Sequence, residues 1–176
     1  MDKSQKLKLL KDSIKSYEDF PKPGIIFRDI FPVFQNTLAL KAMRDLLVEH
    51  VLFLEVDLIV GLDSRGFLLG PMICTEIDKP FVPIRKKGKL PGKVARQNFN
   101  LEYGEATFEL QVESIKEGTR VLIIDDLLAT GGSMGAAVKL LKSLNAEIVE
   151  CLVIMELTEL KAREKLNVSV YSFVQY

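Results

Sequence analysis

The stretch Val121-Leu122-Ile123-Ile124-Asp125-Asp126-Leu127-Leu128-Ala129-Thr130-Gly131-Gly132-Ser133 decides the fold of this chain. An apolar strand runs into two adjacent carboxylates, a turn of small residues follows, and the pattern predicts a helix over Met134–Leu144. Gly131 and Gly132 allow backbone N–H groups to approach a ligand closely. The first turn of the helix points further N–H groups and the positive end of its dipole at the same place. The stretch therefore has the parts of a phosphate-binding turn.

Other apolar runs along the chain have the length of strands and alternate with helical patterns. The predicted strands are Asp57–Leu62, Phe81–Arg85, Arg120–Ile124, Ile148–Met155 and a possible fifth, Val168–Phe173. Helices are predicted over Lys3–Ser16, Thr37–Phe53 and a segment that ends near Ile77. This alternation indicates an α/β fold with an open, mostly parallel sheet and helices on both faces. Ligands bind such sheets beyond the carboxyl ends of the strands.

Two segments depart from this alternation. Phe20–Pro32 holds three prolines and one glycine, which predicts an irregular segment ordered by packing. Asn98–Leu110 alternates apolar and polar residues like a two-stranded antiparallel flap, with its turn near Tyr103-Gly104-Glu105. Neither segment has the composition of a linker, so we expect one domain over residues 1–176.

Composition narrows the class of protein. Twenty-four basic residues balance 24 acidic ones among 176 residues, which argues against a dedicated nucleic-acid binder. The N-terminus lacks the uninterrupted apolar core of a signal peptide, and no apolar run approaches the roughly 20 residues that span a membrane. Cys74 and Cys151 both sit in apolar runs, so we expect buried free thiols rather than a disulfide. These features predict a cytoplasmic protein without a membrane partner.

The turn after Ile124 differs from two common phosphate-binding motifs. A P-loop needs a Lys and then Ser or Thr after its glycines, whereas Met134 and Gly135 follow Ser133 here, and the glycine spacing does not fit a dinucleotide fingerprint. The paired carboxylates would repel a phosphate unless they face another group, such as ribose hydroxyls or Mg²⁺. The alternative is a simple strand-to-helix turn in which Ser133 is the N-cap.

Two further segments carry charge that packing does not explain. Gly61-Leu62-Asp63-Ser64-Arg65-Gly66 follows one predicted strand and opens a helix, which suits a second anion, although a surface salt bridge would also account for it. In Arg85–Arg96, six of twelve residues are basic and none is acidic. Such a run is a solvated loop, a nucleic-acid patch, or a mobile loop that attracts a highly charged substrate and closes over it.

The strand, acid pair and Thr-Gly turn of residues 121–133 resemble the signature of the type I phosphoribosyltransferases. The resemblance implies that fold, with an N-terminal hood over 1–35 and a basic flexible loop over 85–100. It implies a 5′-phosphate site formed by Ala129, Thr130, Gly131, Gly132 and Ser133, and ribose contacts from Asp125 and Asp126. It implies pyrophosphate contacts from Asp63, Ser64, Arg65, Arg85 and Lys89, with a candidate cis peptide near Asp63-Ser64. It also implies a homodimer and Mg²⁺ held mainly by the substrate, with the two aspartates as possible further ligands.

Phe20-Pro21-Lys22-Pro23-Gly24-Ile25-Ile26-Phe27-Arg28-Asp29-Ile30 is similar to the base-binding hood of the adenine-specific members of this family. The resemblance implies that Ile26, Phe27, Arg28 and Leu127 bind adenine. Leu101-Glu102-Tyr103-Gly104 is similar to the flap of the same enzymes, which implies a catalytic acid/base role for Glu102 and a flap role for Tyr103. Arg65 would be catalytic by stabilising the charge of the leaving pyrophosphate. The similarity extends to Leu157–Leu166 near the end of the chain.

The expected reaction joins adenine to phosphoribosyl pyrophosphate and releases AMP and pyrophosphate. One alternative is a phosphoribosyltransferase for another purine. The resemblance disfavours it, because it implies that main-chain groups near Ile26 and Arg28 read the amino edge of adenine, and an oxo group would reverse that hydrogen-bond pattern. A second alternative is a non-catalytic regulator that binds phosphoribosyl pyrophosphate. A panel of purine substrates separates the first alternative, and ligand binding without AMP formation would favour the second.

Overall fold

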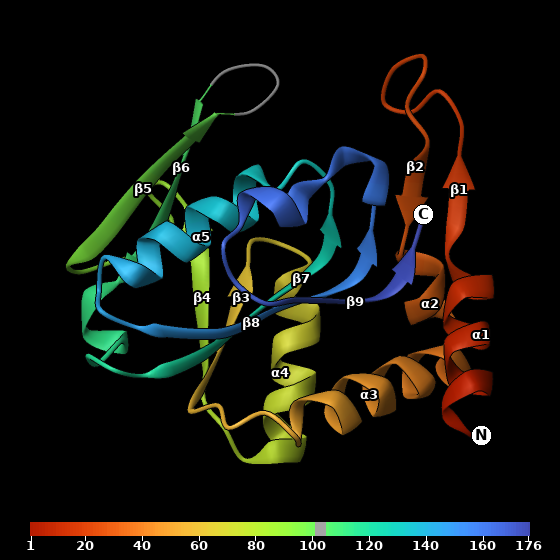
Figure 1. Cartoon of the computed structure of the whole chain (residues 1–176), viewed down its shortest axis with the longest axis horizontal. Coiled ribbons are helices and arrows are strands. Elements are labelled where there is room, and N and C mark those ends of the chain that lie inside the picture. The colour runs from red at the N-terminus through yellow and green to blue at the C-terminus, as the bar shows by residue number, and fades with distance from the viewer. Residues whose placement is uncertain (101–104) are drawn as a thin grey trace. The chain divides into compact units, whose positions relative to one another are not determined.

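The computed structural model describes residues 1–100 and 105–176, which divide into two compact units, Met1–Val51 and Leu52–Tyr176 (Figure 1). The elements of the first unit are α1 (Lys3–Ser13), β1 (Lys15–Tyr17), β2 (Phe27–Asp29), α2 (Phe31–Gln35) and α3 (Thr37–Val51). The segment predicted to be irregular thus contains β2, which pairs antiparallel with β1. The predicted helix over Lys3–Ser16 ends at Ser13, because Ile14 adopts an extended backbone. The predicted hood, residues 1–35, lies within this unit.

The second unit is built on a sheet with the strand order β5-β6-β4-β3-β7-β8-β9, seven strands within the described residues. Its strands are β3 (Leu58–Leu62), β4 (Phe81–Lys86), β5 (Val94–Asn100), β6 (Glu105–Gln111), β7 (Arg120–Leu128), β8 (Glu147–Glu156) and β9 (Val170–Gln175). Its helices are α4 (Gly66–Ile77), α5 (Gly132–Lys142) and the 3₁₀ segments η1 (Val112–Ser114), η2 (Thr158–Leu160) and η3 (Ala162–Lys165). The five strands from β4 to β9 in this order pair in parallel, whereas β5 and β6 pair antiparallel.

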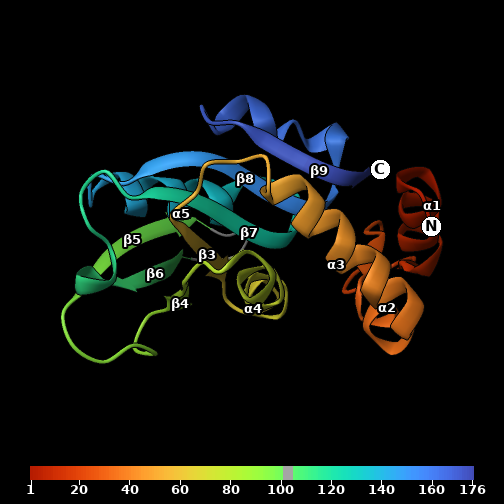
Figure 2. The ribbon, with the colours of Figure 1, turned by 90° about the horizontal axis from the view of Figure 1, so that it is seen from below.

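The helices α4 and α5 cover opposite faces of this sheet. The crossover from β3 through α4 leads to β4 on one side, whereas the crossover from β7 through α5 leads to β8 on the other side. Right-handed crossovers in opposite directions place their helices on opposite faces, and Figure 2 shows α4 end-on below the strands. The predicted fold class, an open and mostly parallel sheet with helices on both faces, is therefore confirmed.

Strand alternation supplies the core. Val60, Val121 and Ile123 pack in one apolar cluster with Met134 and Leu140 of α5, whereas the neighbouring strand residues point to the other face. Both cysteines are buried and free, as predicted. Burial raises the pKa of the Cys74 thiol to about 11 and that of Cys151 to about 12. None of the helices in the described residues has the length and apolar content to cross a bilayer.

The basic loop predicted over 85–100 is shorter in the structure. Arg85 and Lys86 close β4, and 94–100 form β5, so 87–93 alone connect the two strands. The nearly fully buried carboxylate of Glu109 on β6 accepts hydrogen bonds from the Gly88 amide at 2.8 Å and from Arg96 Nε at 2.8 Å. The Arg96 hydrogen bond, together with the Gly88 amide, lowers the pKa of Glu109 below its usual range. The predicted antiparallel flap is confirmed as β5 and β6, and 101–104 between them lie outside the described residues.

Candidate functional site

The predicted phosphate-binding turn is a tight connection between β7 and α5. The strand continues through Asp125 and Asp126 to Leu128, further than the sequence predicts, and α5 begins at Gly132. Gly131, not Ser133, is the N-cap, and its φ of 84° lies in the left-handed region that favours glycine. Because a glycine has no side chain to accept from the first N–H groups of α5, these donors are available to an anion.

A second loop reaches the same edge of the sheet from β3. The peptide between Asp63 and Ser64 is cis, at the position that the resemblance implies. A Cβ on Gly66 would lie 2.6 Å from the carbonyl oxygen of Ile124, so the start of α4 lies directly against β7. This close approach brings Arg65, the N-cap of α4, to the acid pair at the end of β7.

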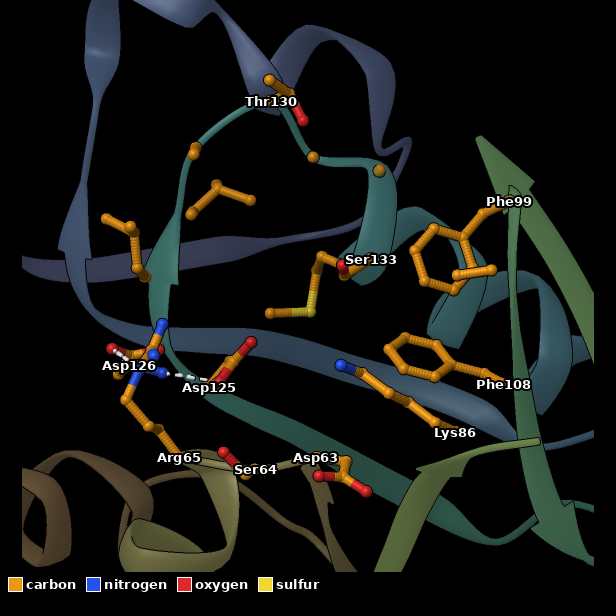
Figure 3. A pocket seen from close by; sticks show the side chains of 17 residues that line it. Asp63, Ser64, Arg65, Lys86, Phe99, Phe108, Asp125, Asp126, Thr130 and Ser133 are labelled. Carbon is orange, nitrogen blue, oxygen red and sulfur yellow. Dashed lines mark hydrogen bonds and ion pairs between the residues drawn. The ribbon is translucent and has the colours of Figure 1, made fainter. Parts of the chain in front are cut away.

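These two loops, β4 and the flap enclose a pocket of about 360 Å³ (Figure 3). All of its lining residues belong to the second unit. They are Asp63, Ser64, Arg65, Lys86, Phe99, Ala106, Phe108 and the continuous run from Asp125 to Met134. The structure therefore brings together eleven of the predicted site residues, namely Asp63, Ser64, Arg65, Asp125, Asp126, Leu127, Ala129, Thr130, Gly131, Gly132 and Ser133.

The two aspartates of the pocket have different surroundings. The Asp126 carboxylate is 2% exposed and forms an ion pair with Arg65 Nε. Asp125 accepts a hydrogen bond from the Asp126 amide at 2.9 Å. Burial, and then the neighbouring charge of Asp126, raise the pKa of Asp125 well above its ordinary range. A hydroxyl donor or a cation beside Asp125 would relieve this cost.

Lys86 supplies a further cation to the pocket. Figure 3 shows its side chain and that of Asp125 pointing into the pocket from β4 and β7. With Arg65, it gives the pocket two cationic side chains beside the N-terminus of α5, which favours an anionic ligand. No group of three or more His, Cys, Asp or Glu side chains suited to a metal ion occurs in the part of the chain that the structure describes.

Arg85 and Lys89, both predicted to contact pyrophosphate, do not line this pocket. Arg85 Nε pairs with Asp63 Oδ2 at 3.2 Å, and its guanidinium lies 5.8 Å from the centre of the Phe67 ring. Its Nη1 donates to the carbonyl oxygen of Lys89 at 3.4 Å. Arg85 therefore connects the loop at Asp63 to the basic connection 87–93.

The predicted adenine-binding residues Ile26, Phe27 and Arg28 lie in the first unit, so the pocket described above does not include them. Ile26 is exposed, and the Phe27 ring packs edge-on against Phe20 at 5.1 Å. Arg28 Nη1 donates to the hydroxyl of Ser16 at 2.5 Å. Leu127, the fourth predicted adenine contact, lines the pocket. Glu102 and Tyr103 lie outside the described residues.

Six pocket residues were not predicted from the sequence: Lys86, Phe99, Ala106, Phe108, Leu128 and Met134. The Phe99 and Phe108 rings lie 4.6 Å apart on neighbouring strands of the flap and form one apolar wall. The alternation in the flap showed that one of its faces is apolar, but it did not show what that face covers. Lys86 belongs to the basic run, and only the end of β4 shows that it enters the pocket.

Comparison with known proteins identifies the family. The model of the phosphoribosyl transferase domain matches residues 33–174. Human adenine phosphoribosyltransferase is 47% identical over 174 residues, which are 97% of this chain and 97% of the human protein. The chain belongs to the phosphoribosyltransferase family.

Solved structures of phosphoribosyltransferases agree with this assignment. Adenine phosphoribosyltransferase from Saccharomyces cerevisiae, solved with an imino-altritol bisphosphate and adenine, matches with a TM-score of 0.91 and 40% identity over 97% of this chain and 99% of that one. The enzyme from Trypanosoma brucei, solved with AMP, pyrophosphate and ribose-5-phosphate, matches with a TM-score of 0.89 and 32% identity over 97% of this chain and 79% of that one. Both comparisons cover nearly all of this phosphoribosyltransferase chain.

Proposed function

We propose that this chain transfers the 5-phosphoribosyl group of phosphoribosyl pyrophosphate to adenine, giving AMP and pyrophosphate. One observation carries the proposal: the turn 129–133, the N-terminus of α5 and the acid pair line one pocket at the same edge of the sheet. A sugar phosphate presents an anion and a pair of hydroxyls on one molecule. The 47% identity to the human adenine enzyme supports the choice of base.

The sugar phosphate is the first part of this proposal. The amides from Thr130 to Ser133 and the dipole of α5 bind the 5′-phosphate. Asp125 and Asp126 accept hydrogen bonds from the ribose hydroxyls. Binding a donor is favourable for Asp125 in particular, because burial and the neighbouring Asp126 make its carboxylate costly to keep charged.

Pyrophosphate then lies on the opposite side of the pocket. Ser64 and Arg65 approach it from the cis-peptide loop, and Lys86 approaches it from β4. As the bond between the ribose C1′ and the pyrophosphate oxygen breaks, Arg65 and Lys86 stabilise the negative charge that develops on the leaving group. Neither Arg85 nor Lys89 lines the pocket as it stands, so contact between either residue and pyrophosphate requires movement.

Mg²⁺ fits this arrangement as the companion of pyrophosphate. Mg²⁺ prefers oxygen ligands, and it is usually bound through one or two carboxylates together with substrate phosphates. Asp125 and Asp126 supply such carboxylates, and a cation beside them offsets the repulsion that raises the pKa of Asp125. The ion, held mainly by the substrate, supplies positive charge that makes pyrophosphate a better leaving group.

Adenine is the third part of the proposal. Leu127 offers an apolar contact at the pocket, and Phe27 offers an aromatic face for stacking. Main-chain groups near Ile26 and Arg28 read the amino edge of adenine, a pattern that hypoxanthine and guanine reverse. Glu102 accepts the proton that adenine loses as its N9 attacks the sugar.

One assay tests this proposal. The purified chain is mixed with phosphoribosyl pyrophosphate, Mg²⁺ and, in parallel, adenine, hypoxanthine or guanine, and nucleotide formation is followed by absorbance. We expect AMP to form rapidly and the other two bases to react at least about a hundredfold more slowly. Inosine or guanosine monophosphate as the faster product would refute the choice of base. Binding of phosphoribosyl pyrophosphate without any product would favour the regulator instead.

The acid/base role needs a separate experiment. Glu102→Ala and Glu102→Gln are compared with the unchanged chain at saturating substrates. We expect kcat to fall about 100-fold or more in both, because general acid–base catalysis contributes about that factor. Unchanged turnover in Glu102→Ala would refute the assignment.

The assembly and the compartment complete the proposal. We propose a homodimer on the basis of the family resemblance. We propose that it resides in the cytoplasm, because its two cysteines are buried free thiols. Sedimentation equilibrium at micromolar concentration tests the dimer. A single species at the 19.8 kDa mass of one chain would refute it.

A further inference from the structure

The segment between β8 and β9 lies directly behind the phosphate-binding turn (Figure 3). Ala162 is 1% exposed, and a Cβ on Gly131 would lie 3.2 Å from its Cβ. The ammonium of Lys165 donates to the carbonyl oxygen of Thr130 at 3.4 Å. Neither Ala162 nor Lys165 lines the pocket, yet the segment contacts the turn at two successive positions, Thr130 and Gly131.

This segment cannot hold its own shape. It consists of η2 and η3, and 3₁₀ pieces of three or four residues have poor hydrogen-bond geometry and no cooperative stability. Lys161 between them has a φ of 51°, in the region that costs a non-glycine residue energy. Contacts with the rest of the unit therefore hold the segment in place: Ala162 and Leu166 pack in the apolar core, and the Thr158 amide donates to the Tyr176 carbonyl at 3.0 Å.

Arg163 adds an ion pair to these contacts. Its Nε and Nη2 donate to Oε1 and Oε2 of Glu156, each at 2.6 Å, in the two-pronged geometry that makes an arginine–carboxylate pair strong. Its Nη1 donates to the carbonyl oxygen of Val170 at 2.6 Å, and its Nη2 also reaches the Ser172 hydroxyl at 3.0 Å. The guanidinium thus joins η3 to two strands of the sheet.

Glu156 is a fixed point for this pair. Its carboxylate is 3% exposed and also accepts from the Ser172 hydroxyl at 2.6 Å. The hydrogen bond from Arg163 lowers the pKa of Glu156 below its usual range. In the register of the sheet, Glu156 lies opposite Leu128, the last residue of β7, and the next amide, of Leu157, donates to the Leu128 carbonyl at 2.9 Å. The pair therefore lies at the end of β8, beside the last residue of β7, the strand that leads into the turn.

We propose that Arg163 is a positioning residue for the sugar-phosphate site. By locking η3 onto Glu156, it holds Ala162 against Gly131 and Lys165 against Thr130, and so fixes the amides of the turn before the substrate arrives. A turn that is already ordered loses less conformational entropy when a phosphate binds. The inference rests on the proposed function, because it assigns Arg163 to the same turn that binds the 5′-phosphate.

Variants of Arg163 and a matched control test this role. Arg163→Gln removes the charge and the fork, and Arg163→Lys keeps the charge with a single ammonium. The control is Arg120→Gln, because Arg120 pairs with Glu147 at 2.6 Å and also bonds the Glu55 carbonyl, but does so at the opposite end of β7 and β8. For each chain, KM for phosphoribosyl pyrophosphate, KM for adenine and kcat are measured, together with the Kd for ribose 5-phosphate by calorimetry.

For Arg163→Gln we expect KM for phosphoribosyl pyrophosphate and Kd for ribose 5-phosphate to rise about tenfold, the lower end of what supporting contacts contribute at other sites. KM for adenine should stay within about twofold, since adenine does not touch the turn. Arg163→Lys should fall between Arg163→Gln and the unchanged chain, and Arg120→Gln should match the unchanged chain. If Arg163→Gln does not fold, Arg163→Lys against Arg120→Gln decides the question.

The outcomes separate this inference from the proposed function. If the unchanged chain binds ribose 5-phosphate but forms no AMP, the function fails, and the Kd values alone decide whether Arg163 positions the turn. If the unchanged chain is active and Arg163→Gln leaves both phosphate-dependent constants unaltered, the inference is wrong and the function stands. An equal rise in KM for both substrates, or a loss of kcat alone, would indicate general disruption and would also overturn the inference. No binding of ribose 5-phosphate to the unchanged chain overturns both.

Discussion

Replacing Gly131 by Ala should cost more stability than any other glycine-to-alanine change at a left-handed turn of the second unit, and should weaken substrate binding as well. With a φ of 84°, an alanine there loses about 1–2 kcal/mol to backbone strain, less about 0.4–1 kcal/mol because alanine restricts the unfolded chain. The new methyl would also lie 3.2 Å from the Ala162 Cβ, and overpacking adds about 1–3 kcal/mol. The sum is a loss of about 1–5 kcal/mol.

Gly118→Ala is the matched control. Gly118 has a φ of 77°, but a Cβ there would meet nothing within 4 Å, and it lies before β7 rather than after it. Only the backbone terms apply, so we expect a loss of about 1 kcal/mol with unchanged kinetics. Both variants are measured by urea unfolding at equilibrium, and KM for phosphoribosyl pyrophosphate is measured in parallel.

A double variant isolates the steric part of the loss. Ala162→Gly removes the methyl that the new Cβ would meet, and the Ala162 oxygen then lies at an ordinary contact distance of 3.5 Å. The coupling energy between Gly131→Ala and Ala162→Gly should therefore be favourable, about 1 kcal/mol or more. Equal losses for Gly131→Ala and Gly118→Ala, with no coupling to Ala162, would refute the claim that η3 limits the space behind the turn.

Three further predictions follow from the buried ionisable groups. Asp125→Asn should abolish activity yet raise the free energy of unfolding at neutral pH. The raised pKa of Asp125 destabilises the fold only at pH values where the unfolded carboxyl is ionised. In a pH series of urea titrations, the gain should therefore disappear as the pH falls below the ordinary value of 3.8. Glu109→Gln should speed hydrogen exchange at the Gly88 amide. Because the pKa of Glu109 is lowered, the stabilisation that its carboxylate gives is present above the ordinary pKa of 4.5 and is lost as the pH falls through the lowered pKa. Exchange unchanged from the parent chain would contradict the role of Glu109 in holding 87–93. With thiol pKa values of about 11 and 12, Cys74 and Cys151 should react with an aromatic disulfide reagent at pH 8 only after denaturation, whereas rapid labelling of the native chain would show that one of them is accessible.

Features that depend on neighbours along the chain were predictable. The strand, acid pair and turn of 121–133 were recognised because strand periodicity, two carboxylates and two glycines fall within thirteen consecutive residues. The two free cysteines were predictable because apolar flanking residues indicate burial. The basic run was recognised from its charge, but its division into β4, a short connection and β5 was not, because strand pairing with β6 overrides the loop composition of residues 94–100.

Contacts between distant residues were decided by the tertiary structure. Arg65 meets Asp126 because β3 and β7 are neighbours in the sheet, although 61 positions separate the two residues. Phe99 and Phe108 face the pocket because of the register of β5 on β6. Sequence spacing along one chain does not contain strand order or register, which depend on how the apolar faces of all elements pack together.

The sequence by itself therefore predicted the kind of chemistry, since the turn expected to bind phosphate and its acid pair are local and consist of residue types that few other roles require together. Only the tertiary structure decided how that turn is held, because the η3 contact with Gly131 and the pair between Arg163 and Glu156 arise where the ends of β7, β8 and β9 meet. The physical reason is that bonding preferences belong to single residues, whereas their positions relative to one another are fixed by burial of the core.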